Sequence, residues 1–138
     1  MRVATSIIYD RRVYFVVLLI CVFAMWNFFG PKPIQDIDAA VIGQLQEAGS
    51  DMSKEHKVDF SLYFPSQENA QTAAAEIIKI YPSFKTRILP SEGTEWLLDV
   101  SGDIVPNLSK MQTIRIDFDR IAATVHGEYD GWGALIVK

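Results

Sequence analysis

The sequence predicts an α+β domain in which two helices cover one face of a four-stranded antiparallel sheet. One stretch with strict apolar-polar alternation and two longer stretches with an apolar residue at every third or fourth position predict this fold. A third observation, an apolar run near the N-terminus, predicts a membrane-spanning helix ahead of the domain. The 138 residues are enough for one such domain and an appendage.

The apolar run is this appendage. No charged residue occurs from Val13 to Pro31, and as a helix these nineteen residues reach about 28 Å. The hydrocarbon core of a bilayer is about 30 Å thick, so the run is long enough to cross it. We therefore expect a tail at residues 1–12, a transmembrane helix at 13–30, and contact with the lipid bilayer through Val13 to Phe29.

Two other interpretations of the apolar run are weaker. A cleaved signal peptide needs small residues before its cleavage site, and Met25 to Phe29 is bulky. A lipoprotein site at Cys21 is disfavoured because Ile20 stands where a small residue is expected. Cys21 is the only cysteine, so it forms no disulfide within the chain. An uncleaved anchor is the prediction that remains.

The charges on either side of the run predict its orientation. Arg2, Arg11 and Arg12 precede the run, whereas the near flank after it offers only Lys32. Basic residues favour the cytoplasmic side of a membrane. We therefore expect a single-pass protein of the inner (cytoplasmic) membrane, with a cytoplasmic N-terminus and an extracytoplasmic C-terminal domain.

Residues 31–52 are expected to form a connector and an amphipathic helix. Pro31 and Pro33 stiffen the connector because proline cannot continue a helix interior. Gly49 is a plausible end of the helix. We expect this helix to pack near the membrane or onto the domain through its apolar residues, which are Ile34, Ile37, Val41, Leu45 and Ala48.

The alternating stretch predicts the first strand. From Lys57 to Phe64, every second residue is apolar, which is typical of a half-buried strand, and Pro65 ends it. Ser66 is the expected N-cap of the helix that follows. The apolar stripe of that helix consists of Ala70, Ala73, Ala74, Ile77, Ile78 and Tyr81.

The rest of the chain is expected to form two strands, a second helix and a final strand. Two strands are expected at Phe84 to Leu89 and Glu95 to Ser101, and a second helix follows with Asn107 or Ser109 as its N-cap. A final strand then runs to the C-terminus. The order β-α-β-β-α-β is that of a ferredoxin-like sandwich, which we place at residues 53–138. The stripe of the second helix consists of Met111, Ile114, Phe118, Ile121, Ala122 and Val125.

Charge and residue types argue against several functions. From residue 31 on, ten Lys and Arg are scattered among sixteen Asp and Glu, whereas direct nucleic-acid binding needs clustered positive charge. His56 and His126 are the only histidines, and neither stands in a pattern typical of nucleophilic catalysis. A metal site built from His126, Glu128 and Asp130 fits neither zinc nor calcium. We expect no enzymatic activity, no metal and no cofactor.

The most distinctive motif lies near the C-terminus, from Gly127 to Gly133. It combines three glycines, two aromatic residues and two carboxylates. In one interpretation, the glycines form a tight turn or bulge, the tryptophan fills the core, and the tyrosine is anchored through its hydroxyl. In the other, the aromatic rings stay partly exposed and form a protein-binding patch. The candidate partner-binding residues are Glu128, Tyr129, Asp130 and Trp132.

This motif resembles the C-terminal signature of the RraB family, the bacterial regulators of ribonuclease E. The similarity extends over roughly Ile34 to Val137. Besides the signature, the residues that carry it are Gly49-Ser50-Asp51, His56-Lys57-Val58-Asp59-Phe60, Tyr63-Phe64-Pro65, Ala73-Ala74-Ala75, Trp96 and Val105-Pro106. The resemblance implies a ferredoxin-like domain that binds ribonuclease E and inhibits its RNA cleavage without catalysis of its own.

The expected membrane anchor distinguishes this chain from the best-known members of the family, which are soluble and strongly acidic. We expect a membrane-tethered, non-catalytic protein-binding regulator resembling the ribonuclease E inhibitor RraB. The alternative is an extracytoplasmic module on the same fold that binds an envelope protein or forms an oligomer, unrelated to RNA decay. A small hydrolase or ligand-binding domain ranks third.

Overall fold

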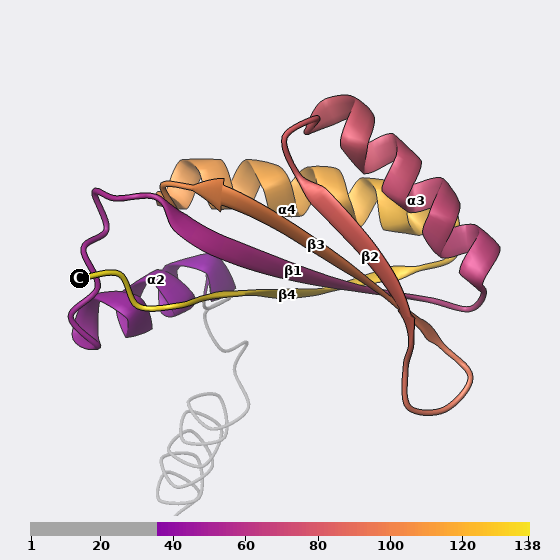
Figure 1. The fold of residues 1–138 in the computed structure, drawn as a ribbon, viewed down its shortest axis with the longest axis horizontal. Helices are drawn as coiled ribbons and strands as arrows, with labels where there is room; N and C mark the ends of the chain where they lie inside the picture. Colours follow the sequence, from indigo (N-terminus) through magenta and orange to yellow (C-terminus); the bar gives the residue numbers. More distant parts are fainter. Residues whose placement is uncertain (1–35) are drawn as a thin grey trace, which may run out of the picture. The chain divides into compact units, whose positions relative to one another are not determined.

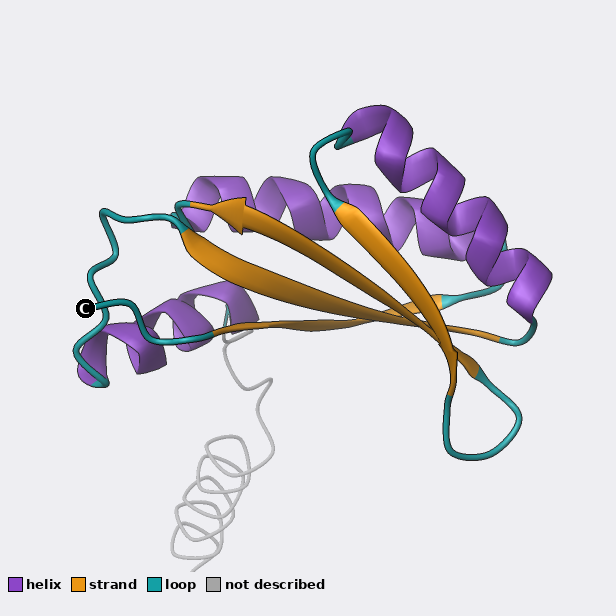
Figure 2. Cartoon of the chain, viewed as in Figure 1, coloured by secondary structure: helices purple, strands orange, loops and turns teal. Residues whose placement is uncertain are grey.

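Three helices and four strands form residues 36–138, the part of the chain that the computed structural model describes (Figures 1 and 2). The predicted transmembrane helix at 13–30 lies outside these residues. Among the residues that are described, no helix is long and apolar enough to cross a membrane. The elements are α2 (Ile37–Glu47), β1 (His56–Phe64), α3 (Gln67–Ile80), β2 (Lys85–Pro90), β3 (Trp96–Ile104), α4 (Leu108–Thr124) and β4 (Glu128–Ala134).

The four strands form one antiparallel sheet in the order β2-β3-β1-β4. The nine-residue strands β1 and β3 occupy the centre, paired without interruption from His56↔Ile104 to Phe64↔Trp96. One helix connects β1 to β2 and another connects β3 to β4. The α+β class is therefore confirmed, and strand order and connections are consistent with the predicted ferredoxin-like sandwich.

The core lies between the sheet and helices α3 and α4, which cover the same face (Figure 1). At its centre the ring of Phe118 meets Phe60 edge-on at 5.1 Å between centroids, and Tyr81 at 5.7 Å. The alternation in β1 is confirmed, as are the apolar stripes of both helices. The most buried residues of this strand and these two stripes, none more than 2% exposed, are Val58, Phe60, Leu62, Phe64, Ala70, Ala73, Ile77, Met111, Ile114, Phe118 and Ala122.

Side-chain caps fix where the helices begin. The hydroxyl of Ser66 accepts a hydrogen bond from the Asn69 amide at 3.1 Å, as predicted for α3. Asn107, one of the two candidates, caps α4 by accepting from the Lys110 amide at 2.9 Å. The cap of α2 is Asp36, which the sequence analysis did not single out.

Several details differ from the expectations. In α2, Leu45 is buried as predicted, whereas Ile37 is 67% exposed and Ala48 is also exposed. Ile42 and the buried carboxylate of Asp38 contribute to the packing instead, and Ile34 lies outside the described residues.

Strand β2 begins one residue late because Phe84 turns into the core. Strand β3 runs three residues beyond its expected end at Ser101, because its pairing with β1 continues to Ile104. Strand β4 ends at Ala134 rather than at the C-terminus, and the last four residues leave the sheet.

Candidate protein-binding site on β4

The signature motif forms a bulged edge strand. Strand β4 pairs with β1 as Ser61↔Gly131 and Leu62↔Tyr129, so Asp130 is an extra residue without a partner in β1. Gly131 has φ 152°, a conformation that side-chain-bearing residues rarely adopt. The structural interpretation of the glycines is therefore confirmed at this bulge.

Gly127 serves close packing instead. A Cβ atom there would lie 2.2 Å from the ring of Phe64 and 2.8 Å from the carbonyl oxygen of Tyr63. Such distances are far inside van der Waals contact, so only glycine fits without movement of the neighbours. Gly133, by contrast, has open space around it and no positive φ. Gly131 is thus required by the backbone conformation and Gly127 by close packing.

Trp132 connects β4 to α2. It pairs with Phe60 and is half-buried against the core, and its indole N–H donates to Asp38 Oδ1 at 3.0 Å. The other carboxylate oxygen, Oδ2, accepts from Arg115 Nε of α4 at 2.7 Å. Because the carboxylate is only 1% exposed, these two donors replace the water it would otherwise bind. Three elements therefore meet at Asp38.

The charge of Asp38 is compensated on both sides. Its hydrogen bond to Arg115 raises the pKa of the guanidinium. A carboxylate in the first turn of a helix is also favoured by the helix dipole, and Asp38 lies in the first turn of α2. Next to it, the side chain of Gln112 hydrogen-bonds Asp36 and is the largest cause of the lowered pKa of that carboxyl. These contacts hold the N-terminus of α2 against α4.

Within the described residues, Tyr129 packs through its ring and not through a hydrogen bond of its hydroxyl. Its ring packs edge-on against Phe118 with centroids 6.0 Å apart. Its hydroxyl oxygen is buried and has no hydrogen-bond partner among residues 36–138. Burial, and then the charges of Asp38 and Asp119, raise the pKa of this hydroxyl. The expected anchor through the tyrosine hydroxyl is therefore wrong, and the tryptophan N–H makes the anchoring bond instead.

The two carboxylates of the signature remain available at the surface. Glu128 and Asp130 are both exposed, as is Asp119 on α4. Tyr129 and Trp132, in contrast, are only partly accessible. The structure thus divides the four candidate residues into two that hold the strand in place and two that present negative charge.

The two histidines have separate structural roles. His56 is fully buried, with Nε2 2.6 Å from Ser50 Oγ and Nδ1 2.9 Å from the Lys54 carbonyl oxygen. The same Ser50 oxygen accepts from the Val137 amide at 2.9 Å, so His56 helps to fix the C-terminal segment. His126 is exposed and has φ 59° at the end of α4. No cluster of three or more metal-ligating side chains occurs within the described part of the chain.

The described residues thus form a two-layer α+β domain whose bulged edge strand is tied to a preceding helix. The family model described as "Regulator of ribonuclease activity B" matches residues 35–134. The chain therefore belongs to the RraB family. The match includes α2, and with it the carboxylate that Trp132 holds. A search of curated proteins found no match.

Sequence reasoning missed Asp38, which accepts the hydrogen bond of Trp132, and Arg115, which binds the other oxygen of Asp38. Neither residue was assigned a role from the sequence. One signal was present: Asp38 stands three residues before Val41 and seven before Leu45, on the helix face that packs. A charged residue on that face requires a buried partner.

Proposed function

We propose that this chain is a non-catalytic regulator that restrains an RNA-degrading enzyme, ribonuclease E or a similar enzyme, by protein contact. The observation that carries the proposal is the family match, which includes every helix and strand from α2 to β4. Family membership makes regulation of ribonuclease activity the first function to test.

The proposed contact surface is the exposed part of the signature strand. Glu128 and Asp130 provide the charges that reach a partner, while Tyr129 and Trp132 fix the backbone that presents them. Asp119 adds a third exposed carboxylate near the tyrosine ring. Such a surface suits a basic segment of the partner protein, and salt should weaken the contact.

We further propose that the chain is tethered to the inner membrane through Val13 to Phe29. This rests on the charge-free run of nineteen residues, which is long enough to cross a bilayer. A tether confines the regulator to the membrane surface and raises its effective concentration toward any partner held there.

The second candidate is an extracytoplasmic module that binds an envelope protein or forms an oligomer. The three arginines before the run favour it, because they predict that the domain leaves the cytoplasm. In that orientation a ribonuclease acting on cytoplasmic RNA is out of reach. Reporters fused after Lys138, each active on only one side of the membrane, separate the two candidates.

The decisive experiment measures RNA cleavage by purified ribonuclease E with and without the full chain, kept in a mild non-ionic detergent. We expect the wild type to slow cleavage. Glu128→Gln combined with Asp130→Asn should weaken inhibition by about 2- to 30-fold, because two exposed ion pairs contribute roughly 0.2–1 kcal/mol each.

The matched control is Glu92→Gln combined with Glu95→Gln, which removes the same charge from exposed positions in the β2–β3 hairpin. It should inhibit like the wild type. Equal inhibition by all three proteins would refute the contact surface on β4. No inhibition by the wild type, together with an extracytoplasmic reporter signal, would refute ribonuclease regulation and favour the envelope module.

A further inference from the structure

The sheet has a second exposed edge, on the side opposite the signature. Strand β2 pairs only with β3, so the outer edge of β2 is free within residues 36–138. Backbone N–H and C=O groups on a free edge can pair with an added strand. The strand order places this edge three positions away from β4, so the two surfaces are separate.

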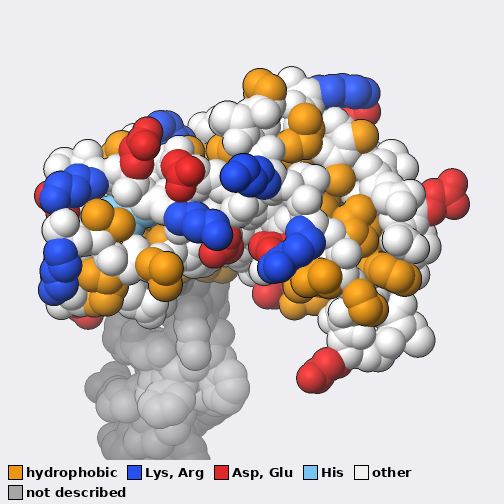
Figure 3. Space-filling view, in the orientation of Figure 1, with side chains coloured by type: hydrophobic (Ala, Val, Ile, Leu, Met, Phe, Trp, Pro, Cys, Tyr) orange, Lys and Arg blue, Asp and Glu red, His pale blue; other side chains and the backbone are white. Residues whose placement is uncertain are grey.

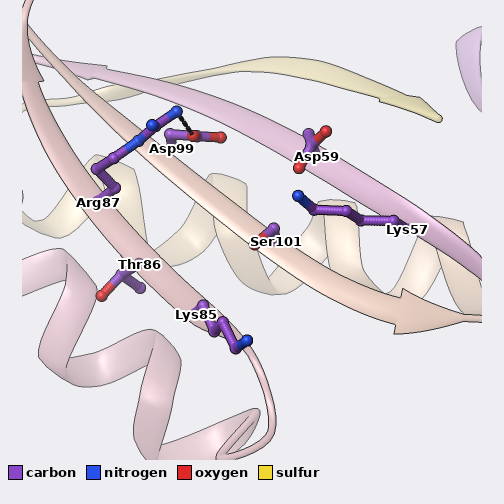
Figure 4. A pocket seen from close by; sticks show the side chains of 7 residues that line it. All are labelled: Lys57, Asp59, Lys85, Thr86, Arg87, Asp99 and Ser101. Carbon is purple, nitrogen blue, oxygen red and sulfur yellow. Dashed lines mark hydrogen bonds and ion pairs between the residues drawn. The ribbon is translucent and has the colours of Figure 1, made fainter. Parts of the chain in front are cut away.

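Beside this edge, the face of the sheet opposite α3 and α4 is hollowed. A depression of about 380 Å³ opens over strands β1, β2 and β3, and Figure 4 shows the side chains around it. Helices α3 and α4 lie on the other face of the sheet (Figure 1). The charged side chains that line the depression are Lys57, Asp59, Lys85, Arg87 and Asp99.

Two of these cations belong to β2 itself. Lys85 and Arg87 are two residues apart in the strand, so their side chains share this face, and both residues are exposed. Arg87 bonds Asp99 through Nη2 at 2.7 Å, which leaves most of its five N–H donors free. Lys85 forms no ion pair with any described residue. Both cations can therefore bind further carboxylates.

The next residue on the same face of β2 is apolar. Leu89 lies opposite Leu97 of β3, which in turn lies opposite Tyr63 of β1, and all three are half-buried. Figure 3 shows the mixture of charged and hydrophobic side chains on the face of the molecule turned to the viewer. Along β2, this face therefore presents two positive charges followed by an apolar position.

The two positive charges on β2 favour some binding partners of this edge over others. A second copy of this chain, pairing β2 with β2, would bring Lys85 and Arg87 close to the same residues of its partner, and like charges across a strand pair are destabilising. An acidic strand would instead place carboxylates beside these two cations, which is favourable. Lysine and arginine on an edge strand are a known protection against self-pairing, and the same charges attract a carboxylate-bearing segment.

We propose that the outer edge of β2 binds an extended acidic segment of a partner protein as a fifth strand. Two carboxylates at alternate positions of the segment contact Lys85 and Arg87, and an apolar side chain two positions further contacts Leu89. Backbone hydrogen bonds to the edge supply affinity, and the alternate side chains supply specificity. This binding goes beyond the regulation of a ribonuclease and does not depend on it.

The test measures binding of a fluorescent peptide to the full chain by anisotropy, in a mild non-ionic detergent. The peptide alternates Glu and Thr and carries one Leu near one end. A second version carries the Leu near the other end, so that both strand directions are tested. We expect one version to bind, and hydrogen exchange of the β2 amides to slow when it does. Lys85→Glu combined with Arg87→Glu should reduce affinity at least about tenfold.

Two controls distinguish strand addition at the β2 edge from non-specific electrostatic attraction. Lys79→Glu combined with Lys110→Glu makes the same charge change on helices α3 and α4 and should leave affinity within about twofold. A peptide with N-methyl groups on alternate amides keeps its charges but loses the edge hydrogen bonds, and it should not bind.

Several outcomes would overturn the proposal. One is an equal loss of peptide affinity in both double variants. Another is full affinity of the N-methylated peptide, and a third is tighter binding of a single-stranded RNA of the same charge. A chain that binds neither peptide, and whose Lys85→Ser/Arg87→Ser variant self-associates, would show that the two cations only prevent self-pairing.

Discussion

The hydrogen bond between Trp132 and Asp38 allows a sharp test of how the signature holds the fold together. Trp132→Phe keeps an aromatic ring at the position and removes the indole N–H that donates to the Asp38 carboxylate. Asp38 is 1% exposed, so water cannot readily replace the lost donor, while Arg115 still satisfies the other oxygen. A buried acceptor left without its partner costs about 1–3 kcal/mol.

We therefore expect Trp132→Phe to lower the free energy of unfolding by about 2 kcal/mol, roughly a 30-fold change in the folding equilibrium. Urea unfolding of the full chain in detergent, followed by far-UV circular dichroism, measures this. Trp96→Phe is the matched control, because Trp96 is also half-buried in the sheet but its indole makes no hydrogen bond within the described part of the chain. It should cost less than about 1 kcal/mol.

A double-mutant cycle with Asp38→Asn isolates the bond itself. If Trp132 acts through Asp38, the loss caused by Trp132→Phe should shrink by at least about 1 kcal/mol in the Asp38→Asn background, because a neutral amide is less costly to leave unpaired. A loss below about 0.5 kcal/mol in the wild type, or an identical loss in both backgrounds, would refute the reasoning.

Three further outcomes are expected, each measured by unfolding of the full chain. Gly131→Ala should cost about 1–2 kcal/mol because φ is 152° there, whereas Gly133→Ala should be close to neutral; similar effects would contradict the role of the bulge. Tyr129→Phe should leave stability unchanged or slightly raised, since its buried hydroxyl has no partner among residues 36–138, and a loss above about 1 kcal/mol would reveal one. Burial and the bond to Asp117 raise the pKa of Tyr81, so the folded state favours the neutral phenol. Its contribution is present below about pH 10 and is lost as the pH rises above that value, and Tyr81→Phe should weaken this alkaline destabilisation.

Much of the fold could be predicted because local patterns and tertiary demands agree. Strict alternation in β1 and the apolar stripes of α3 and α4 exist because one side of each element is buried, so the periods are visible in the sequence. The caps Ser66 and Asn107 act over three residues and were predictable for the same reason. The limits of β2 were not, since they depend on Phe84 turning into the core over Gly102.

The candidate site was predictable only in part. The motif from Gly127 to Gly133 stands out by composition, and its glycines indicated special backbone geometry, which is confirmed at Gly131. Which aromatic residue carries the anchoring bond depends on a helix some ninety positions earlier in the chain. No local pattern contains that information, and the prediction selected the tyrosine hydroxyl instead of the tryptophan N–H.

By itself, the sequence determined the α+β class, the order of strands and helices, the family resemblance and the apolar run, because each of these follows from neighbouring residues or from composition. Only the tertiary structure decided that Asp38 is buried, that it joins Arg115 and Trp132, and that Lys85 and Arg87 line a free sheet edge. The physical reason is distance along the chain. Burial and pairing between remote segments depend on how the elements pack, which a local pattern does not record.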